Sequence, residues 1–209
     1  NPIATAAMRE RARVQPAIES LGNRLGAVHN TGLRRAFTFD GSGRVPLYAG
    51  VDPAVPGAPT IQDIAARYPM YEAALTAEQR VVMSALREDI APYRALLEEV
   101  GVEVPLRPDV MRDGFYLPRG RTTVEGADEP IKVSAGRGVG GKKGFERPSV
   151  FPSQAAGVDA GFNYAPIGDA LSDYAKDAGR RATDQHLANF FRVARDEHGQ
   201  LLGQTPKAR

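Results

Sequence analysis

The stretch from Thr76 to Gly101 constrains the fold of this chain more than any other. It opens with Thr76-Ala-Glu-Gln79, a capping box in which side chains three residues apart satisfy the first amides of a helix. The apolar and aromatic residues that follow are spaced at three and four positions: Val82, Leu86, Ile90, Tyr93, Leu97 and Val100. This spacing predicts an amphipathic helix of about six turns, which Gly101 ends. Because Pro92 lacks a backbone N–H, we expect it to kink this helix or split it in two.

Weaker helical patterns lie on both sides of this stretch. Residues 3–14 predict a short helix, and Pro16 suits the first turn of a second helix that continues to Val28. Residues 60–68 begin with Thr60-Ile-Gln-Asp63, a plausible helix cap, and residues 166–195 predict a long helix. The fold class expected is therefore mainly α: a helical module with long Pro/Gly-rich loops, compatible with a few short strands.

Many of the 22 glycines and 16 prolines fall between these patterns. Residues 30–59 predict either short strands around the Asp40-Gly41 turn or a surface arm. Residues 102–165 lose all helical periodicity, with short strands compatible at 114–118 and 131–134. We therefore expect an N-terminal helical arm and linker, residues 1–58, followed by a helical module, residues 59–209, with an irregular insertion at 102–165.

The composition of the 209-residue chain excludes several kinds of site and segment. It has no cysteine and only three widely separated histidines, so the sequence predicts no disulfide and no zinc site. The net charge of +2 is compatible with acidic partners without requiring them. No apolar run reaches the about 20 residues of a membrane span. Because the chain begins with Asn1, we expect a processed product or a piece of a longer protein.

Catalytic patterns are missing from the sequence as well. No G-x-S-x-G elbow is present, and no pair of carboxylates is placed for glycosidase chemistry. The cluster Asp196-Glu197-His198 is more typical of a solvated helix end than of a ligand set. We therefore expect no catalytic residue and no metal site, and enzyme activity is not the favoured interpretation.

The stretch GRGVGGKKG, residues 136–144, matches two nucleotide-binding patterns in part. A P-loop needs a strand before it, a helix after it and a Ser or Thr after the lysine to reach Mg²⁺. Here Lys143 follows Lys142, and Pro148 and Pro152 disfavour a helix downstream. A dinucleotide fingerprint would need the same strand and helix in a parallel sheet. The sequence therefore predicts no nucleotide and no cofactor.

Two interpretations of the glycine stretch stay open. In the first it is a solvated loop without a ligand. In the second it is a basic finger that contacts phosphate or an acidic partner, because Arg and Lys neutralise phosphates and aromatic rings stack on bases. Phe115, Tyr116 and Phe145 are interleaved with the cations, although four acidic residues in the same region weaken the positive electrostatic field. The candidate contact residues are Arg119, Arg121, Arg137, Lys142, Lys143 and Arg147.

The order of motifs between residues 59 and 192 resembles a recurring region of the large polyvalent proteins of tailed bacteriophages and of phage internal virion proteins. The resemblance lies in a helical pair, the Tyr116-Leu-Pro-Arg119 step, the Phe145-Glu-Arg147 element and the Gly161-Phe-Asn-Tyr164 turn into a helix. It implies a connector or scaffold region of a longer chain, located in the virion or in the host cytoplasm during infection. It carries over no catalytic residue and leaves residues 1–50 unexplained.

The expected function is thus that of a structural and interaction segment of a particle-associated or ejected phage protein. Its expected partners are other virion or phage proteins, further copies of the chain and, as an option, DNA; membrane contact is left open. The alternative is a nucleic-acid-binding accessory domain of a larger phage enzyme. The first interpretation predicts self-association and the second predicts a DNA-binding monomer.

Overall fold

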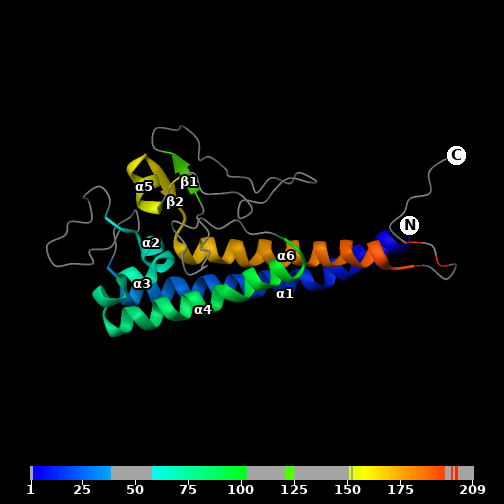
Figure 1. The fold of residues 1–209 in the computed structure, drawn as a ribbon, viewed down its shortest axis with the longest axis horizontal. Coiled ribbons are helices and arrows are strands. Elements are labelled where there is room, and N and C mark those ends of the chain that lie inside the picture. The colour runs from blue at the N-terminus through cyan, green and yellow to red at the C-terminus, as the bar shows by residue number, and fades with distance from the viewer. Residues whose placement is uncertain are drawn as a thin grey trace.

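The computed structural model describes residues 2–38, 58–102, 121–124, 151, 153–195, 199 and 201. Three long helices form the body of this part of the chain: α1 (Pro2–Ala36), α4 (Ala77–Glu99) and α6 (Ile167–Val193). They lie lengthwise against one another, and the shorter elements gather over one end (Figure 1). The prediction of a mainly α-helical protein is confirmed.

The boundaries of α4 follow from local side-chain chemistry. Thr76 Oγ1 accepts a hydrogen bond from Gln79 N at 3.3 Å, and Thr76 N donates to Gln79 Oε1 at 3.0 Å, which confirms the predicted capping box. At the other end Gly101 has a φ of +83°, and Val102 N donates back to Leu97 O at 2.9 Å. This is the Schellman arrangement that glycine favours, so the predicted stop is confirmed as well.

Neither internal proline divides its helix. Pro16 lies inside α1, so the second helix expected to begin there is part of one continuous helix. Pro92 lies inside α4, so of the kink or split expected there the split does not occur. Both prolines are exposed, and buried or half-buried residues continue on each side of them. Burial of those flanking residues against neighbouring helices outweighs one missing backbone hydrogen bond.

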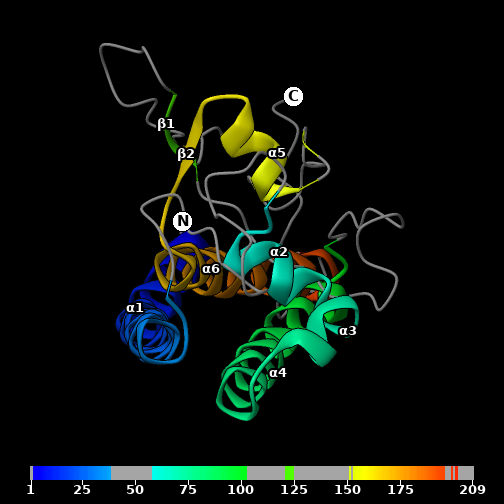
Figure 2. The ribbon, with the colours of Figure 1, turned by 90° about the vertical axis from the view of Figure 1, so that its left-hand side faces the viewer.

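α1 and α6 run antiparallel along one another. Arg11 contacts Asp184, Ile18 packs on Gly179, and Gly26 lies against the Gly168 carbonyl, so rising numbers in one helix meet falling numbers in the other. The N-terminus of the chain therefore lies at the C-terminal end of α6 (Figure 1). α4 packs beside both helices, as the end-on view shows (Figure 2). The predicted domain boundary at residue 58 falls at the edge of a stretch outside the described residues.

The core lies where the three helices meet the short segment before α4. That segment holds α2 (Ile61–Ala66), α3 (Tyr68–Tyr71) and the 3-10 helix η1 (Glu72–Ala74). All six residues of α2 are buried, and Tyr93 of α4 meets Tyr174 of α6 edge to face at 6.4 Å. The largest fully buried apolar side chains come from α1, α2, α4 and α6: Leu33, Ile64, Met83, Leu86, Leu97 and Leu171.

A small unit sits over α2, away from the long helices. It contains α5 (Gln154–Asp159) and the antiparallel strands β1 (Arg121–Val124) and β2 (Phe162–Tyr164), with Val124 opposite Phe162. These elements fall in the region where the sequence predicts irregular structure, and neither strand was predicted. The strands expected at 114–118, at 131–134 and around Asp40 lie outside the described residues.

Candidate functional site

The structure describes one of the six predicted basic contact residues, Arg121. Arg121 is the first residue of β1, and its backbone lies opposite Tyr164 of β2. Arg119, Arg137, Lys142, Lys143 and Arg147 lie outside the described residues, so their role as a phosphate-binding or partner-binding cluster stays a prediction. The Gly161–Tyr164 motif is described: Gly161 has a φ of +84° and is followed by strand β2 before α6 begins, rather than leading directly into the helix.

The first candidate site is the contact between α1 and α6. Four glycines, Gly22, Gly26, Gly168 and Gly179, let the two helices approach. An added Cβ at Gly26 would lie 2.7 Å from the Gly168 carbonyl oxygen, and one at Gly179 would meet Ile18 at 3.1 Å. Gly22 makes room for the side chain of Lys176, whose aliphatic stem passes over it. The packing explains why these positions carry no side chain, and it identifies a structural seam and no ligand site.

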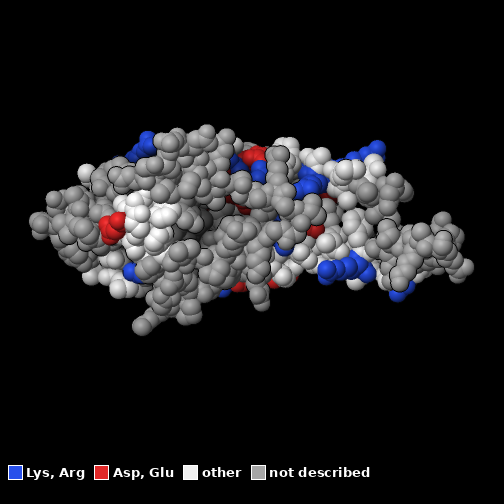
Figure 3. All heavy atoms as spheres, turned by 90° about the horizontal axis from the view of Figure 1, so that it is seen from above, with Lys and Arg blue, Asp and Glu red and all other residues white. Residues whose placement is uncertain are grey.

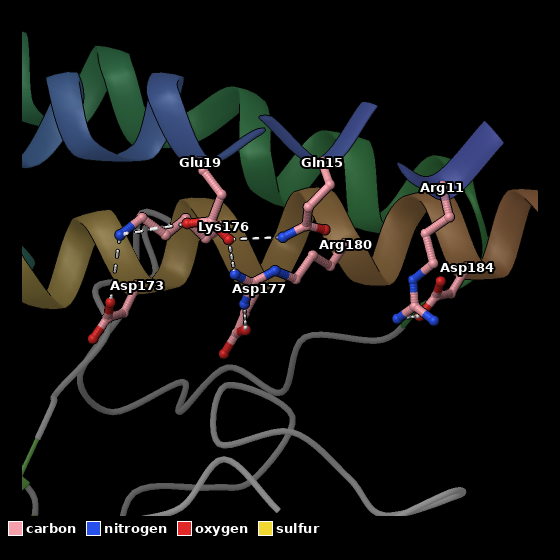
Figure 4. A network of polar contacts seen from close by, with 8 residues as sticks. All are labelled: Arg11, Gln15, Glu19, Asp173, Lys176, Asp177, Arg180 and Asp184. Carbon is pink, nitrogen blue, oxygen red and sulfur yellow. Dashed lines mark hydrogen bonds and ion pairs between the residues drawn. The ribbon is translucent and has the colours of Figure 1, made fainter. Parts of the chain in front are cut away.

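Charged side chains line one edge of this seam (Figure 4). Glu19 accepts a hydrogen bond from Arg180, while Gln15 Nε2 donates to Glu19 Oε1 at 2.7 Å. Lys176 Nζ lies 4.0 Å from both Glu19 Oε2 and Asp173 Oδ1. The hydrogen bond from Arg180 is the main reason why the pKa of Glu19 lies below its ordinary value. The network therefore fixes the register of α1 against α6.

Two polar contacts from α1 hold its neighbours. Asn30 Oδ1 accepts a hydrogen bond from Gly168 N at 3.1 Å, which caps α6 where its own N-cap residue, Pro166, has no side-chain acceptor. The ring of His29 is 4% exposed, and its Nε2 lies 3.0 Å from Asp89 Oδ2 of α4. No group of three or more possible metal ligands exists among the described residues.

Asp63 joins two helices through one carboxylate. It closes the capping box of α2, where Thr60 N donates to Asp63 Oδ2 at 3.3 Å and Asp63 N donates to Thr60 Oγ1 at 3.2 Å. Its two oxygens also accept hydrogen bonds from Gln154 N at 2.7 Å and Ala155 N at 2.8 Å, the first amides of α5. The residue is 3% exposed, so these donors replace the water that the buried charge has lost.

The antiparallel pair of α1 and α6 carries exposed apolar side chains at the end where α1 begins and α6 finishes. Met8 is 64% exposed, Phe190 53% and Val193 74%. Continued from the Arg11–Asp184 pair, the antiparallel register puts Met8 level with Leu187, about one helical turn before Phe190. The exposed cations Arg9 and Arg192 lie beside these residues in the sequence. Neither arginine has an ion pair with a described residue. We call Met8, Arg9, Phe190, Arg192 and Val193 the hairpin end; blue side chains stand out in this part of the molecule when it is seen from above (Figure 3).

One shallow depression lies between α3 and α4. It has a volume of about 510 Å³, opens widely to solvent and is lined by Tyr68, Glu72, Ala77, Arg80, Val81, Ser84, Ala85 and Glu88. Arg80 is turned toward the Glu72 carbonyl oxygen at 3.5 Å. The rest of its lining is mixed: Ala77, Val81 and Ala85 are apolar, whereas Tyr68, Ser84 and Glu88 carry polar groups.

Comparisons with protein-family models, with curated proteins and with solved structures found no match for this chain. Within the described residues no helix has the length and apolar character required to cross a membrane. A proposal about function therefore draws on the sequence motifs, the architecture and the described side chains.

Sequence reasoning identified the Thr60–Asp63 cap but missed the second role of Asp63, and it missed Asn30 altogether. Their partners lie about 90 and 140 residues away along the chain, at separations that no spacing rule covers. The hairpin end was missed for a different reason. Its apolar residues look like the continuation of a core stripe, and only the position of α4 shows that the third helix does not cover them.

Proposed function

We propose that this chain is a structural and interaction segment of a bacteriophage particle-associated protein that acts through protein–protein contact, including contact with further copies of itself. The phage assignment rests on the motif order described above, and the interaction role rests on the hairpin end. Exposed side chains of Met, Phe and Val gathered in one place mark an interaction surface more often than a solvated one.

A second copy is the occupant that we propose for the hairpin end. Two copies related by a two-fold axis would bring the same apolar surfaces together, and the two hairpins would form a four-helix contact. Because stable interfaces bury about 800 Å² on each partner, three apolar side chains supply only the centre of such a contact. We therefore expect reversible, concentration-dependent association.

Salt dependence separates this function from the DNA-binding alternative. Arg9 and Arg192 have no ion pair within the described residues, so two hairpin ends would bring like charges close together. Added salt screens that repulsion, and self-association should become stronger. DNA binding would show the opposite behaviour, because salt competes for phosphates that the cations neutralise.

The test is sedimentation velocity of the purified chain, alone and with a short duplex DNA, at low and moderate salt. We expect a monomer–oligomer equilibrium that moves toward the oligomer as salt rises and is not altered by DNA. A double variant, Phe190→Ser with Val193→Ser, should stay monomeric. Val81→Ser serves as the control, because Val81 is 69% exposed but lies on α4, away from the hairpin end.

Two results would contradict the proposal. The first is a wild-type chain that stays monomeric at every concentration and salt. The second is a monomer that shifts with DNA and is released as salt rises, which would favour the accessory-domain alternative and make Lys142 and Lys143 the first residues to replace. An oligomer that the double variant retains would leave the interaction role in place and exclude the hairpin end as its surface.

A further inference from the structure

The joint at Asp63 supports an inference that is independent of the proposed function. The unit that it holds, Phe151 together with α5 and β2 at residues 153–164, we call the cap; strand β1 pairs with its β2. The cap has its own internal contacts. Ser153 Oγ accepts a hydrogen bond from Ala156 N at 3.0 Å, and Phe151 packs on Phe162 with ring centroids 5.1 Å apart. Gly157 leaves room for the ring of Tyr164, whose Cζ would lie 2.8 Å from an added Cβ.

Among the described residues, the hydrogen bonds that join α5 to the helical body end on one carboxylate. Asp63 Oδ1 and Oδ2 accept from Gln154 N and Ala155 N, and all three residues are at most 6% exposed. α2 supplies this carboxylate and lies between α5 and the long helices (Figures 1 and 2). Beyond β2 the chain reaches α6 through only two residues, 165 and 166.

We propose that the cap opens from the helical body as one unit, and that Asp63 is the latch that holds it closed. The physical reason is the difference between the two kinds of contact. The three long helices share an extended apolar core, whereas the cap is fastened by two charge-assisted hydrogen bonds beside a short helix. Units with few apolar contacts to the rest of a protein open at lower free energy than its core. Opening uncovers the side of α2 that faces α5.

Hydrogen exchange followed by mass spectrometry tests this in the wild-type chain and in Asp63→Asn. In the wild type, amides of residues 154–164 should exchange together and faster than those in the middle of α4 and α6. The asparagine keeps one oxygen but turns an NH₂ group toward an amide donor. Since a hydrogen bond to a charged group is lost, exchange in the cap should become at least about tenfold faster. Exchange in α4 and α6 should change much less.

Three matched variants make the result specific. Thr60→Val removes a partner of Asp63 within α2 and should loosen α2 while the cap keeps its protection. Ser153→Ala removes the cap's own N-terminal acceptor and should loosen the cap without touching Asp63. Asp173→Asn makes the same chemical change at an 81% exposed carboxylate and should alter neither.

The proposal would be overturned in two ways. Cap and long helices could lose protection together and to the same extent, which would mean that they form one cooperative unit. Alternatively, Asp63→Asn could leave exchange in the cap unchanged, which would mean that the two hydrogen bonds do not hold it. Should Asp63→Asn fail to fold, the wild-type pattern and Ser153→Ala decide between the same outcomes. None of these outcomes depends on self-association at the hairpin end.

Discussion

Replacing Gly26 by alanine tests the close approach of α1 and α6. An ideal Cβ at this position would lie 2.7 Å from the Gly168 carbonyl oxygen and 2.9 Å from Ser172 Cβ. The nearest atom belongs to the backbone of a packed helix, so no rotamer change can relieve the contact and the helices must separate. Overpacking of this kind costs about 1–3 kcal/mol. The intrinsic gain of replacing glycine by alanine in a helix is about 1 kcal/mol, so we expect a net loss of up to about 2 kcal/mol.

Gly32→Ala is the matched control, because the substitution and the helix are the same. Its added Cβ would meet only the methyl groups of Val82, at 3.6 and 3.8 Å, which is ordinary van der Waals contact. The helix-forming gain of about 1 kcal/mol should therefore appear undiminished, and this variant should be more stable than the wild type.

Thermal unfolding followed by circular dichroism at 222 nm measures both variants. At about 2–4 °C per kcal/mol for a chain of this size, the melting temperatures should move in opposite directions and differ by several degrees. Equal stabilisation by both substitutions would refute the reasoning, because it would mean that Gly26 has room for a side chain and that the two helices are not in contact there.

The remaining predictions concern the polar groups of the seam. Asn30→Ala removes the acceptor that caps α6 and should cost about 1 kcal/mol in urea unfolding, whereas the exposed Asn23→Ala should cost little. The pKa of Glu19 is lower in the folded chain, so its contribution to stability is present above the ordinary value of 4.5 and is lost as the pH falls. Acid unfolding should consequently be less steep in Glu19→Gln than in the wild type, while Glu99→Gln at an exposed position keeps the wild-type profile; identical profiles for Glu19→Gln and the wild type would show that Arg180 does not hold this carboxylate.

The sequence predicted those parts of the fold that neighbouring residues determine. The start of α4 depends on Thr76 and Gln79, and its end depends on Gly101; both positions follow from contacts within five residues. Pro16 and Pro92 show the limit of such rules. The sequence predicted a helix start at Pro16 and a kink or split at Pro92, and tertiary burial of the surrounding residues keeps each helix continuous.

The contacts that define the candidate sites could not be predicted in the same way. Asp63 was recognisable as a cap of its own helix, but its hydrogen bonds to α5 depend on how residues 64–153 return the chain to α2. Strands β1 and β2 are four and three residues long, too short to show the alternation that predicts a half-buried strand. Whether a stripe of apolar residues is covered depends on where a third helix ends, and the exposed Phe190 and Val193 are the result.

The central claim is that copies of this chain meet through the hairpin end, and a distance between copies tests it most directly. Because the chain has no cysteine, Met8→Cys introduces a single position for a spin label. We expect pulsed electron paramagnetic resonance on the associated protein to give a defined short distance between the labels of two copies. A label at Val81→Cys, on the first turns of α4, should give none. A short distance at Val81 with none at Met8 would contradict the account.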